Sequence, residues 1–365
     1  TARSSTTVVA CTITTAFTNT NATAAFNLGA FSDTTGHPSC VSFFEQRLVF
    51  AGTTDEPQTL FFSKAGDYEN MTTGTNADDA MVYTIASNQV NAIRYMKAVR
   101  TLVVGTTGGE FTVSADGTDA SITPTNITIK RQSSFGSANV DAIPAGNAIL
   151  FLQKAKRKIR ELQYNFDSDG YQAPDLTILN ETVTDTGINE MSYQQEPGSN
   201  IWCVRDDGVL ACLTYQRSEN VIAWSRHIFG GVFGSGKAVC ESVASISGVL
   251  TEDEVWVIVK RTINGATKRF VECFSDFDFD ETSPTSFKFL DSHLSYSGSG
   301  TTTLSGLAHL EGQTVSILGD GATHANKTVS SGAITLDRSV TSACVGLPYD
   351  SILQTMRIEG GAAEG

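Results

Sequence analysis

The stretch GVFGSGKAVC, residues 231–240, has the residue types and spacing of a phosphate-binding loop. Its first seven letters fit G-x-x-x-x-G-K, in which backbone N–H groups surround phosphates and a following Ser or Thr binds Mg²⁺. Ala238 occupies the position of that hydroxyl. The residues after it alternate as in a strand, although a phosphate loop leads into a helix. We therefore predict a glycine-rich connector between two strand units, with Lys237 as an exposed loop charge.

Other combinations that support catalysis or metal binding are incomplete. NFDSDGY, with Asp167 and Asp169, supplies half of a calcium loop but lacks the later ligands, so an Asp-Gly turn is favoured. The five histidines have no metal-ligand spacing, and no G-x-S-x-G nucleophile motif is present. The many carboxylates leave a glycosidase-type pair open without indicating one. The sequence predicts no catalytic residue, no metal and no cofactor.

The stretch FSDFDFDET places three aspartates at a period of two, so that on a strand they share one face. Such a row can bind a cation, but it is more often a solvated face or an acidic rim in a ring assembly. The three residues are Asp276, Asp278 and Asp280.

The stretch QKAKRKIREL contains the one basic cluster of the chain, which we call the basic hairpin. It could contact DNA phosphates. In a strongly acidic chain, an exposed sheet edge or a contact with a partner protein is the favoured interpretation. Its residues are Lys154, Lys156, Arg157, Lys158 and Arg160.

Composition and charge narrow the class of protein. The 365 residues are 40% hydrophobic and 18% charged, which is enough apolar material for a sizeable core. The formal net charge of −14 argues against wrapping nucleic acid, which needs clustered Lys and Arg. No apolar run approaches the roughly 18 residues of a membrane-spanning helix. Abundant Thr, Ser and Gly favour strands joined by many turns.

The seven cysteines form no C-x-x-C pair and no cluster with histidine. Most lie in apolar, strand-like runs, for example Cys203 and Cys273. We expect them to be small buried residues in a protein that works in a reducing compartment.

An internal repeat is the main organising feature. Several segments share a short apolar strand, a polar turn and a second alternating strand, with a period of about 50 residues. Hairpin turns such as Asp207-Gly208 and Asn264-Gly265 separate the strands. The repeat predicts an all-β, multi-bladed β-propeller of five or more blades. The residues that align are Leu48, Leu102, Leu150, Ile201 and Trp256.

The composition changes after about residue 290, where short strands are broken by Gly-rich turns. We predict four regions along the chain. They are an N-terminal extended β segment (1–36), propeller blades (37–290), a small β-barrel or sandwich module (291–356) and a Gly-rich tail (357–365).

Three blocks in this order resemble bacteriophage tail nozzle proteins, also called tail tubular protein B. The first block contains Gln46-Arg47-Leu48, Pro57-Gln58-Thr59, Ser63 and Gly66-Asp67-Tyr68. The others are YQQEPGSNIWCVRDDGVLACLTYQRSENVIAWSRH and LSGLAHLEGQTVSILGDG. The resemblance runs through most of residues 30–356.

The resemblance implies a structural virion protein in the tail of a short-tailed phage, assembled in the cytoplasm of the bacterial host. Copies of such proteins form a hexameric ring that contacts the adaptor and tail fibre proteins and lets the genomic DNA pass. No catalytic residues belong to this role. Nozzle proteins are commonly longer, so the chain is expected to be a fragment or a reduced relative.

In a nozzle, acidic walls would repel DNA and keep it from sticking, whereas lysines would hold it. We therefore expect some of the excess carboxylates, with Asp276, Asp278 and Asp280 as candidates, to face the lumen. The alternative is a propeller that binds or hydrolyses a cell-surface glycan, because propellers support both kinds of function. Exposed aromatic residues and a convergent carboxylate pair would favour that alternative.

Overall fold

The computed structural model describes residues 2–3, 9–10, 30–86, 90–117, 120–248, 252–275, 283–285 and 287–355. Within these ranges the chain forms strands, three short 3₁₀ helices and no α-helix. The 3₁₀ helices are η1 (Glu181–Val183), η2 (Arg217–Glu219) and η3 (Ala308–Leu310). The predicted all-β class is confirmed.

Five antiparallel sheets follow one another along the chain, and each is built from consecutive strands, as in the blades of a propeller. Blade 1 contains β3 (Cys40–Phe44), β4 (Arg47–Ala51), β5 (Thr59–Phe62) and β6 (Met81–Thr84). Blade 2 contains β7 (Ile93–Ala98), β8 (Leu102–Thr106), β9 (Gly109–Ala115) and β10 (Ile127–Arg131). Blade 3 contains β11 (Ile143–Ala145), β12 (Ala148–Leu152), β13 (Ile159–Asn165) and β14 (Gly170–Gln172).

The last two blades differ in their number of strands. Blade 4 contains β15 (Ile188–Gln194), β16 (Asn200–Arg205), β17 (Leu210–Gln216) and β18 (Val221–His227). Blade 5 has three described strands, β21 (Val239–Ile246), β22 (Glu254–Ile263) and β23 (Ala266–Cys273). The predicted multi-bladed β-propeller class is confirmed, and the five residues aligned by the repeat all lie on the second strand of a blade.

The blades pack face to face, which explains why their strands are apolar on both sides. All five residues of β12 are buried, because blade 3 is covered by blade 2 on one face and by blade 4 on the other. Val103 packs with Phe151 across the first of these interfaces, and Leu150 packs with Ile201 across the second. Full coverage replaces the usual alternation of apolar and polar residues with a continuous apolar run.

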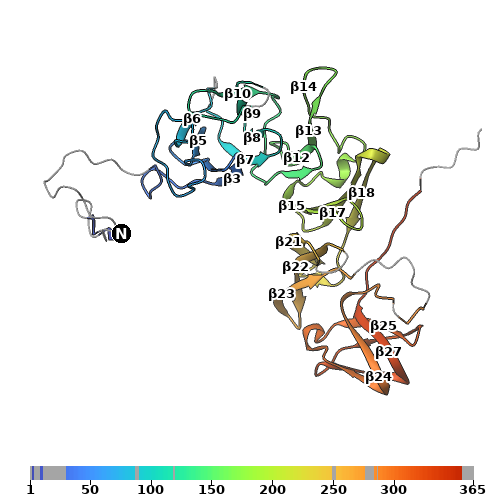
Figure 1. The fold of residues 1–365 in the computed structure, drawn as a ribbon. Coiled ribbons are helices and arrows are strands. Elements are labelled where there is room, and N and C mark those ends of the chain that lie inside the picture. The colour runs from blue at the N-terminus through green and yellow to red at the C-terminus, as the bar shows by residue number, and fades with distance from the viewer. Residues whose placement is uncertain are drawn as a thin grey trace, which may run out of the picture.

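The row of blades is curved and open. Figure 1 shows it running from blade 1, in blue, to blade 5, in orange, without returning to its start. Hydrophobic clusters join each blade to the next, but no such cluster and no backbone hydrogen bond of the described residues joins blade 5 to blade 1. Each end of the row therefore presents one sheet face that no other blade of the described chain covers.

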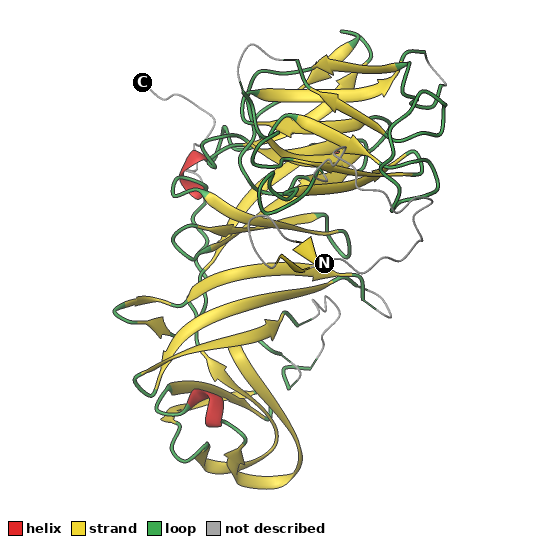
Figure 2. Cartoon of the chain, turned by 90° about the vertical axis from the view of Figure 1, so that its left-hand side faces the viewer, coloured by secondary structure: helices red, strands yellow, loops and turns green. Residues whose placement is uncertain are grey.

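The C-terminal module is a separate sheet with its own core. Its strands, in spatial order, are β24 (Asp291–Ser305), β27 (Ala333–Leu347), β25 (Thr314–Gly319) and β26 (Ala322–Thr328). Leu310, Val315 and Ile334 lie in its buried cluster, and Figure 2 shows its long strands at the lower end of the molecule. The turn that begins at Asp320 is held to β27, because the Asp320 carboxylate accepts hydrogen bonds from the backbone N–H groups of Thr341 and Ser342.

The glycine-rich stretch that resembles a phosphate loop forms a small hairpin of β19 (Val232–Phe233) and β20 (Gly236–Lys237). Strand β21 follows directly, so no helix begins at Ala238, and that residue is buried. The Lys237 side chain is exposed. The stretch joins blade 4 to blade 5 and lacks the helix N-terminus that a phosphate loop uses.

The prediction of buried cysteines is wrong at one position. Cys203 is fully buried, but Cys273 is exposed. Cys273 pairs with Trp256 in register on blade 5 and lies on the sheet face away from blade 4. Its apolar neighbours in sequence indicated a strand correctly, but they did not indicate that this strand ends the row.

Candidate functional site

The predicted acidic row, Asp276, Asp278 and Asp280, lies outside the described residues. Its orientation toward a lumen stays a prediction. The predicted Gly-rich tail, 357–365, also lies outside them, whereas the N-terminal region contributes one antiparallel pair of short strands, β1 (Ala2–Arg3) and β2 (Val9–Ala10).

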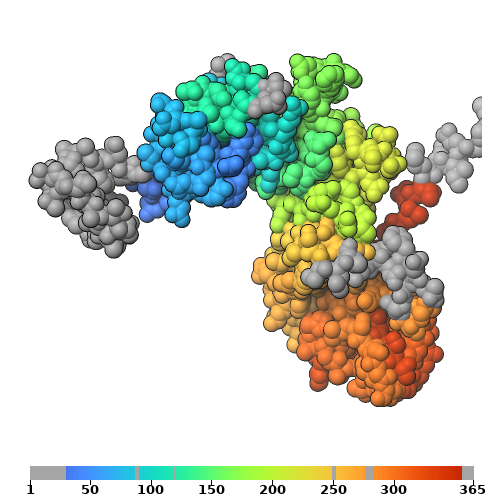
Figure 3. Space-filling view, in the orientation of Figure 1, coloured from blue at the N-terminus to red at the C-terminus, as the bar shows by residue number. Residues whose placement is uncertain are grey.

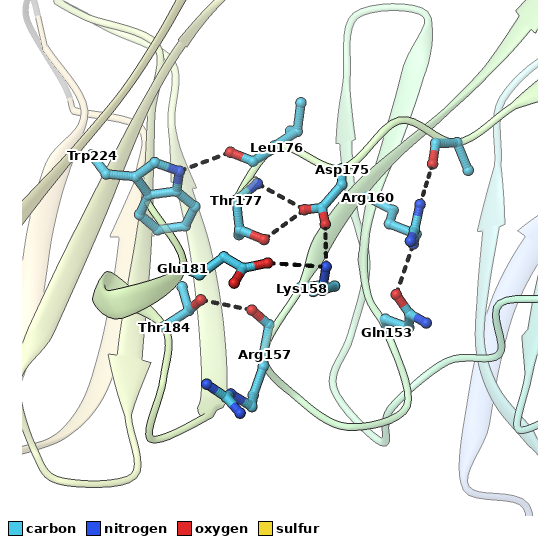
Figure 4. A network of polar contacts seen from close by, with 11 residues as sticks. Gln153, Arg157, Lys158, Arg160, Asp175, Leu176, Thr177, Glu181, Thr184 and Trp224 are labelled. Carbon is cyan, nitrogen blue, oxygen red and sulfur yellow. Dashed lines mark hydrogen bonds and ion pairs between the residues drawn. The ribbon is translucent and has the colours of Figure 1, made fainter. Parts of the chain in front are cut away.

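The basic hairpin comprises the turn between β12 and β13 of blade 3 and the start of β13. Figure 4 shows Lys158 and Arg160 bound to groups of the same chain. Lys158 Nζ lies 2.8 Å from Asp175 Oδ2 and 3.4 Å from Glu181 Oε1. The hydrogen bond to Asp175 raises the pKa of Lys158. Burial acts to raise the pKa of Asp175, but the bonds from Lys158 and Thr177 outweigh it, so that pKa lies below its usual value. These charges fasten segment 175–184 to blade 3.

Arg160 is also used inside the chain. Its Nε donates to Gln153 Oε1 at 2.8 Å, and its Nη1 donates to the Ala173 carbonyl at 2.7 Å. The guanidinium lies 3.5 Å from the centroid of the Phe135 ring, which adds a cation–π contact between the linker from blade 2 and blade 3. Arg160 therefore binds groups of its own chain, and its contact with a partner stays a prediction.

The tip of the basic hairpin is different. Lys154, Lys156 and Arg157 are exposed. Lys156 Nζ donates to Asn189 Oδ1 at 2.9 Å, whereas the side chains of Lys154 and Arg157 have no ion pair or hydrogen bond within the described part of the chain. A pocket of about 290 Å³ lies beside them, lined by Gln153, Ala155, Arg157, Lys158 and Glu181. The sequence therefore predicted correctly that the five cations lie close together. It did not indicate that Lys158 and Arg160 are paired within the chain whereas Lys154 and Arg157 are not.

A second pocket, of about 300 Å³, lies next to the β13–β14 hairpin. We call it the hairpin pocket. It is lined by Gln163, Tyr164, Asn165, Phe166, Asp167, Gln172, Pro174 and Arg217. Asp167 lies in the turn of this hairpin, as the favoured Asp-Gly turn predicted, and it also lines the pocket. Within the described residues, no group of three or more His, Cys, Asp or Glu side chains can hold a metal ion.

A buried carboxylate that the sequence analysis missed lies between blades 2 and 3. Glu110 of β9 is fully buried and accepts hydrogen bonds from the hydroxyls of Ser133 and Ser137. Burial raises the pKa of Glu110 to about 7, although the bond from Ser137 acts to lower it. No periodic sequence pattern indicates that Glu110 is buried and hydrogen-bonded, because Ser133 and Ser137 lie on the linker that follows blade 2.

Buried arginines also escaped the sequence analysis. Arg47 donates to the carbonyls of Ser63 at 2.8 Å, Ala77 at 2.7 Å and Asp79 at 2.7 Å. Arg261 is fully buried between the Glu272 carboxylate and the Gly230 carbonyl. Arg47 and Ser63 belong to the block that resembles nozzle proteins, so these two motif residues fasten a long loop of blade 1.

The comparisons with known proteins concern the fold. No family model matches the chain, and no curated protein matches it. It is similar to the crystal structure of Chaetomium thermophilum Raptor, at 10% identity and a TM-score of 0.40 over 87% of this chain and 28% of that one. The Myceliophteria thermophila Cps50 (Swd1) β-propeller domain matches 67% of this chain and 88% of that one, at 8% identity and a TM-score of 0.33.

A luciferin-regenerating enzyme matches over 59% of this chain and 80% of that one, at 11% identity and a TM-score of 0.25. The chain spans little more than a quarter of the Raptor structure. Similarity this low carries no activity or partner over to this chain. Among the described residues, no helix is long and apolar enough to cross a membrane.

Proposed function

We propose that the chain is a non-enzymatic structural subunit of a homo-oligomeric ring, the tail nozzle of a phage virion. The proposal rests on an apolar stripe across the face of blade 1 that is turned away from blade 2. Val41 pairs with Phe50, Phe50 with Phe61, and Phe61 with Val82, so one row of apolar side chains crosses all four strands. The side chains of Val41 and Val82 are 61% and 45% exposed.

We call this surface the blade-1 end face, and it also includes Phe43 and Leu48. Phe43 and Leu48 pair directly beside the stripe, and Phe43 is 60% exposed. Phe31 covers part of the surface, with its ring 5.4 Å from that of Phe50 and 5.0 Å from that of Phe61. A contiguous apolar patch of this kind is typical of a surface that another protein covers.

The opposite end of the row also presents apolar residues, but they lie beside the ion pairs of Glu241 with Lys260 and Arg269. On blade 5, Ile258 pairs with Val271, and Trp256 pairs with Cys273, all on the side away from blade 4. Val271 and Ile246 are exposed. We call these residues the blade-5 end face. Two unlike end faces on one chain support a head-to-tail contact between copies, which is the kind of interface that closes into rings.

The distribution of charge fits a channel that DNA crosses without binding. The chain carries a net charge of −14. Lys158 and Arg160, two of the five cations of the basic hairpin, are held by their own chain. A chain with few free clustered cations neutralises few phosphates, so DNA binds it weakly. The free cations at the hairpin tip, Lys154 and Arg157, are then available to an adaptor, a fibre or a neighbouring subunit.

The glycosidase alternative has less support. Hydrolysis of a glycoside uses two carboxyl groups that face the same bond. The hairpin pocket contains one carboxylate in its lining, Asp167. The pocket beside the basic hairpin contains Glu181, which pairs with Lys158. Neither lining supplies the pair.

Electron microscopy of the purified chain, together with light scattering, tests the proposed function. We expect closed rings of identical subunits with a central channel, and weak DNA binding that salt abolishes. A monomer at micromolar concentration, or glycan hydrolysis by that monomer, would overturn the structural role.

A further inference from the structure

The hairpin pocket lies between blades 3 and 4, on the rim of the molecule. The β13–β14 hairpin projects from the row of blades, as Figure 1 shows at the top and Figure 3 shows as a green protrusion. One wall of the pocket is this hairpin, and the other is Arg217, the first residue of η2 on blade 4. A surface pocket of about 300 Å³ is at the lower end of the range that binds small ligands.

The guanidinium of Arg217 is oriented by an ion pair with the buried carboxylate of Glu161. Glu161 of β13 is 1% exposed, and its Oε2 lies 3.2 Å from Arg217 Nη2. Its other oxygen, Oε1, accepts a hydrogen bond of 2.9 Å from the Tyr215 hydroxyl. The Oε2 atom makes this ion pair but accepts no hydrogen bond. Burying a carboxylate is costly, and here the buried charge orients a half-exposed arginine at the pocket.

The hairpin contributes amide groups on the same face of its sheet. Gln163 and Gln172 are paired in register and exposed, and Asn165 pairs with Gly170 on the next same-face position. Each amide offers both a hydrogen-bond donor and an acceptor. The Asn165 Oδ1 atom accepts from the Ser168 backbone N–H at 3.0 Å, which fixes the orientation of that amide.

An aromatic ring completes the lining. Phe166 lies in the turn of the hairpin and is 87% exposed. Turn residues are usually polar or glycine, so a phenyl ring at this position contributes nothing to the core and is available to a ligand. Its face provides an apolar surface beside amides and a guanidinium.

We propose that the hairpin pocket binds a saccharide. The C–H face of a sugar ring packs on Phe166, and its neighbouring hydroxyls exchange hydrogen bonds with the amides of Gln163 and Gln172. Arg217 donates to a further hydroxyl or to the carboxylate of an acidic sugar. The lining holds one carboxylate, so the site binds the sugar without cleaving it. The site lies within one subunit and does not depend on the proposed ring.

Saturation-transfer NMR tests this site with defined probes. The probes are the methyl glycosides of glucose, galactose, mannose, N-acetylglucosamine and rhamnose, together with D-glucuronate. We expect saturation of at least one probe by the wild-type chain. Saturation of glucuronate alone supports a site that selects an acidic sugar through Arg217, and saturation of a neutral glycoside supports a site based on hydroxyls. No saturation of any probe would overturn the saccharide site.

Two variants test whether the saccharide binds in the hairpin pocket. Phe166→Ala should weaken the association about five- to tenfold, because it removes the aromatic surface. Leu179→Ala is the matched control, since Leu179 is 90% exposed and lies outside the pocket lining. Equal thermal midpoints show that both variants remain folded. Binding that survives Phe166→Ala unchanged, or that Leu179→Ala weakens equally, would contradict a site in this pocket.

Discussion

The two faces of blade 1 carry similar side chains in different surroundings. Val49, Leu60 and Phe62 on one face are buried against blade 2. Val41 and Phe43 on the other face are more than half exposed. A solvated sheet face normally carries polar residues in alternation with the buried ones. The blade-1 end face therefore has the composition of an inter-blade interface, and no blade of the described residues packs on it.

Blade 3 shows what such a face looks like when it is covered. Leu150 and Leu152 pack toward blade 4, and Ile149 and Phe151 pack toward blade 2. Every residue of β12 is buried as a result. Blade 1 therefore differs from blade 3 in its position in the row rather than in its sequence pattern.

The largest effect is expected on the covered face of blade 1. Leu60→Ala should lower the free energy of unfolding by about 2–5 kcal/mol, because it leaves a cavity in the cluster shared with blade 2. Urea denaturation measures this difference. Leu179→Ala, at an exposed position, should change it by less than about 0.5 kcal/mol. Equal losses in the two variants would contradict the assignment of the inter-blade core.

A pH-dependent effect is expected at the interface of blades 2 and 3. The pKa of Glu110 is raised to about 7, so the folded state binds this proton more tightly than the unfolded state does. Its contribution to stability is therefore complete below about pH 4.3 and is lost as the pH rises through about 7, a change of about 4 kcal/mol. Glu110→Gln should remove this dependence.

Urea titrations at pH 5 and pH 8 measure the Glu110 effect. The wild-type chain should lose stability between these values, and Glu110→Gln should lose much less. Glu69→Gln, at an exposed glutamate, should behave as the wild type does. An unchanged pH dependence in Glu110→Gln would show that other groups cause it.

A smaller gain is expected at the turn between β3 and β4. Glu45 and Gln46 both have positive φ values, 45° and 59°, a conformation that disfavours residues with a Cβ atom. Gln46→Gly should raise the free energy of unfolding by about 0.5 kcal/mol, since glycine adopts this conformation without a steric cost. Gln46→Ala keeps the Cβ atom and should give no gain. A loss of stability in Gln46→Gly would mean that the turn is not strained.

The blades could be predicted from the repeat, because each blade repeats the same local pattern of apolar strands and polar turns. Leu48 and Leu102 could be aligned because each lies on a buried second strand of a similar unit. The sequence did not predict that the row of blades stays open. An apolar strand has the same sequence pattern whether or not another blade covers its face. Cys273 was assigned to the core for this reason.

The site features depended on contacts between distant parts of the chain. Arg217 reaches Glu161 from the next blade, and Arg47 binds carbonyls of a loop that begins after blade strand β5. The sequence separation of these partners follows no recognisable motif, so neither contact could be predicted. The basic hairpin was visible because its cations are adjacent, but the carboxylates that neutralise Lys158 come from a later segment.

The smallest effect on the fold should come from the exposed end faces. Val41→Glu on blade 1 and Val271→Glu on blade 5 should each change the free energy of unfolding by about 0.5 kcal/mol or less, because both side chains are mostly exposed. Each variant should nevertheless prevent assembly, since it places a charge in an apolar interface. Lys237→Glu, which changes the charge of an exposed loop residue on the blade 4–blade 5 connector, is the control.

The mass of the particle in solution decides whether the blade-1 end face joins subunits. Light scattering of the wild-type chain and of Val41→Glu, at the same micromolar concentration, compares the blade-1 end face with and without a charge. We predict a closed multi-subunit particle for the wild type and a folded monomer for the variant. A wild-type monomer, or an assembly that Val41→Glu leaves intact, would contradict the claim that this face joins the subunits.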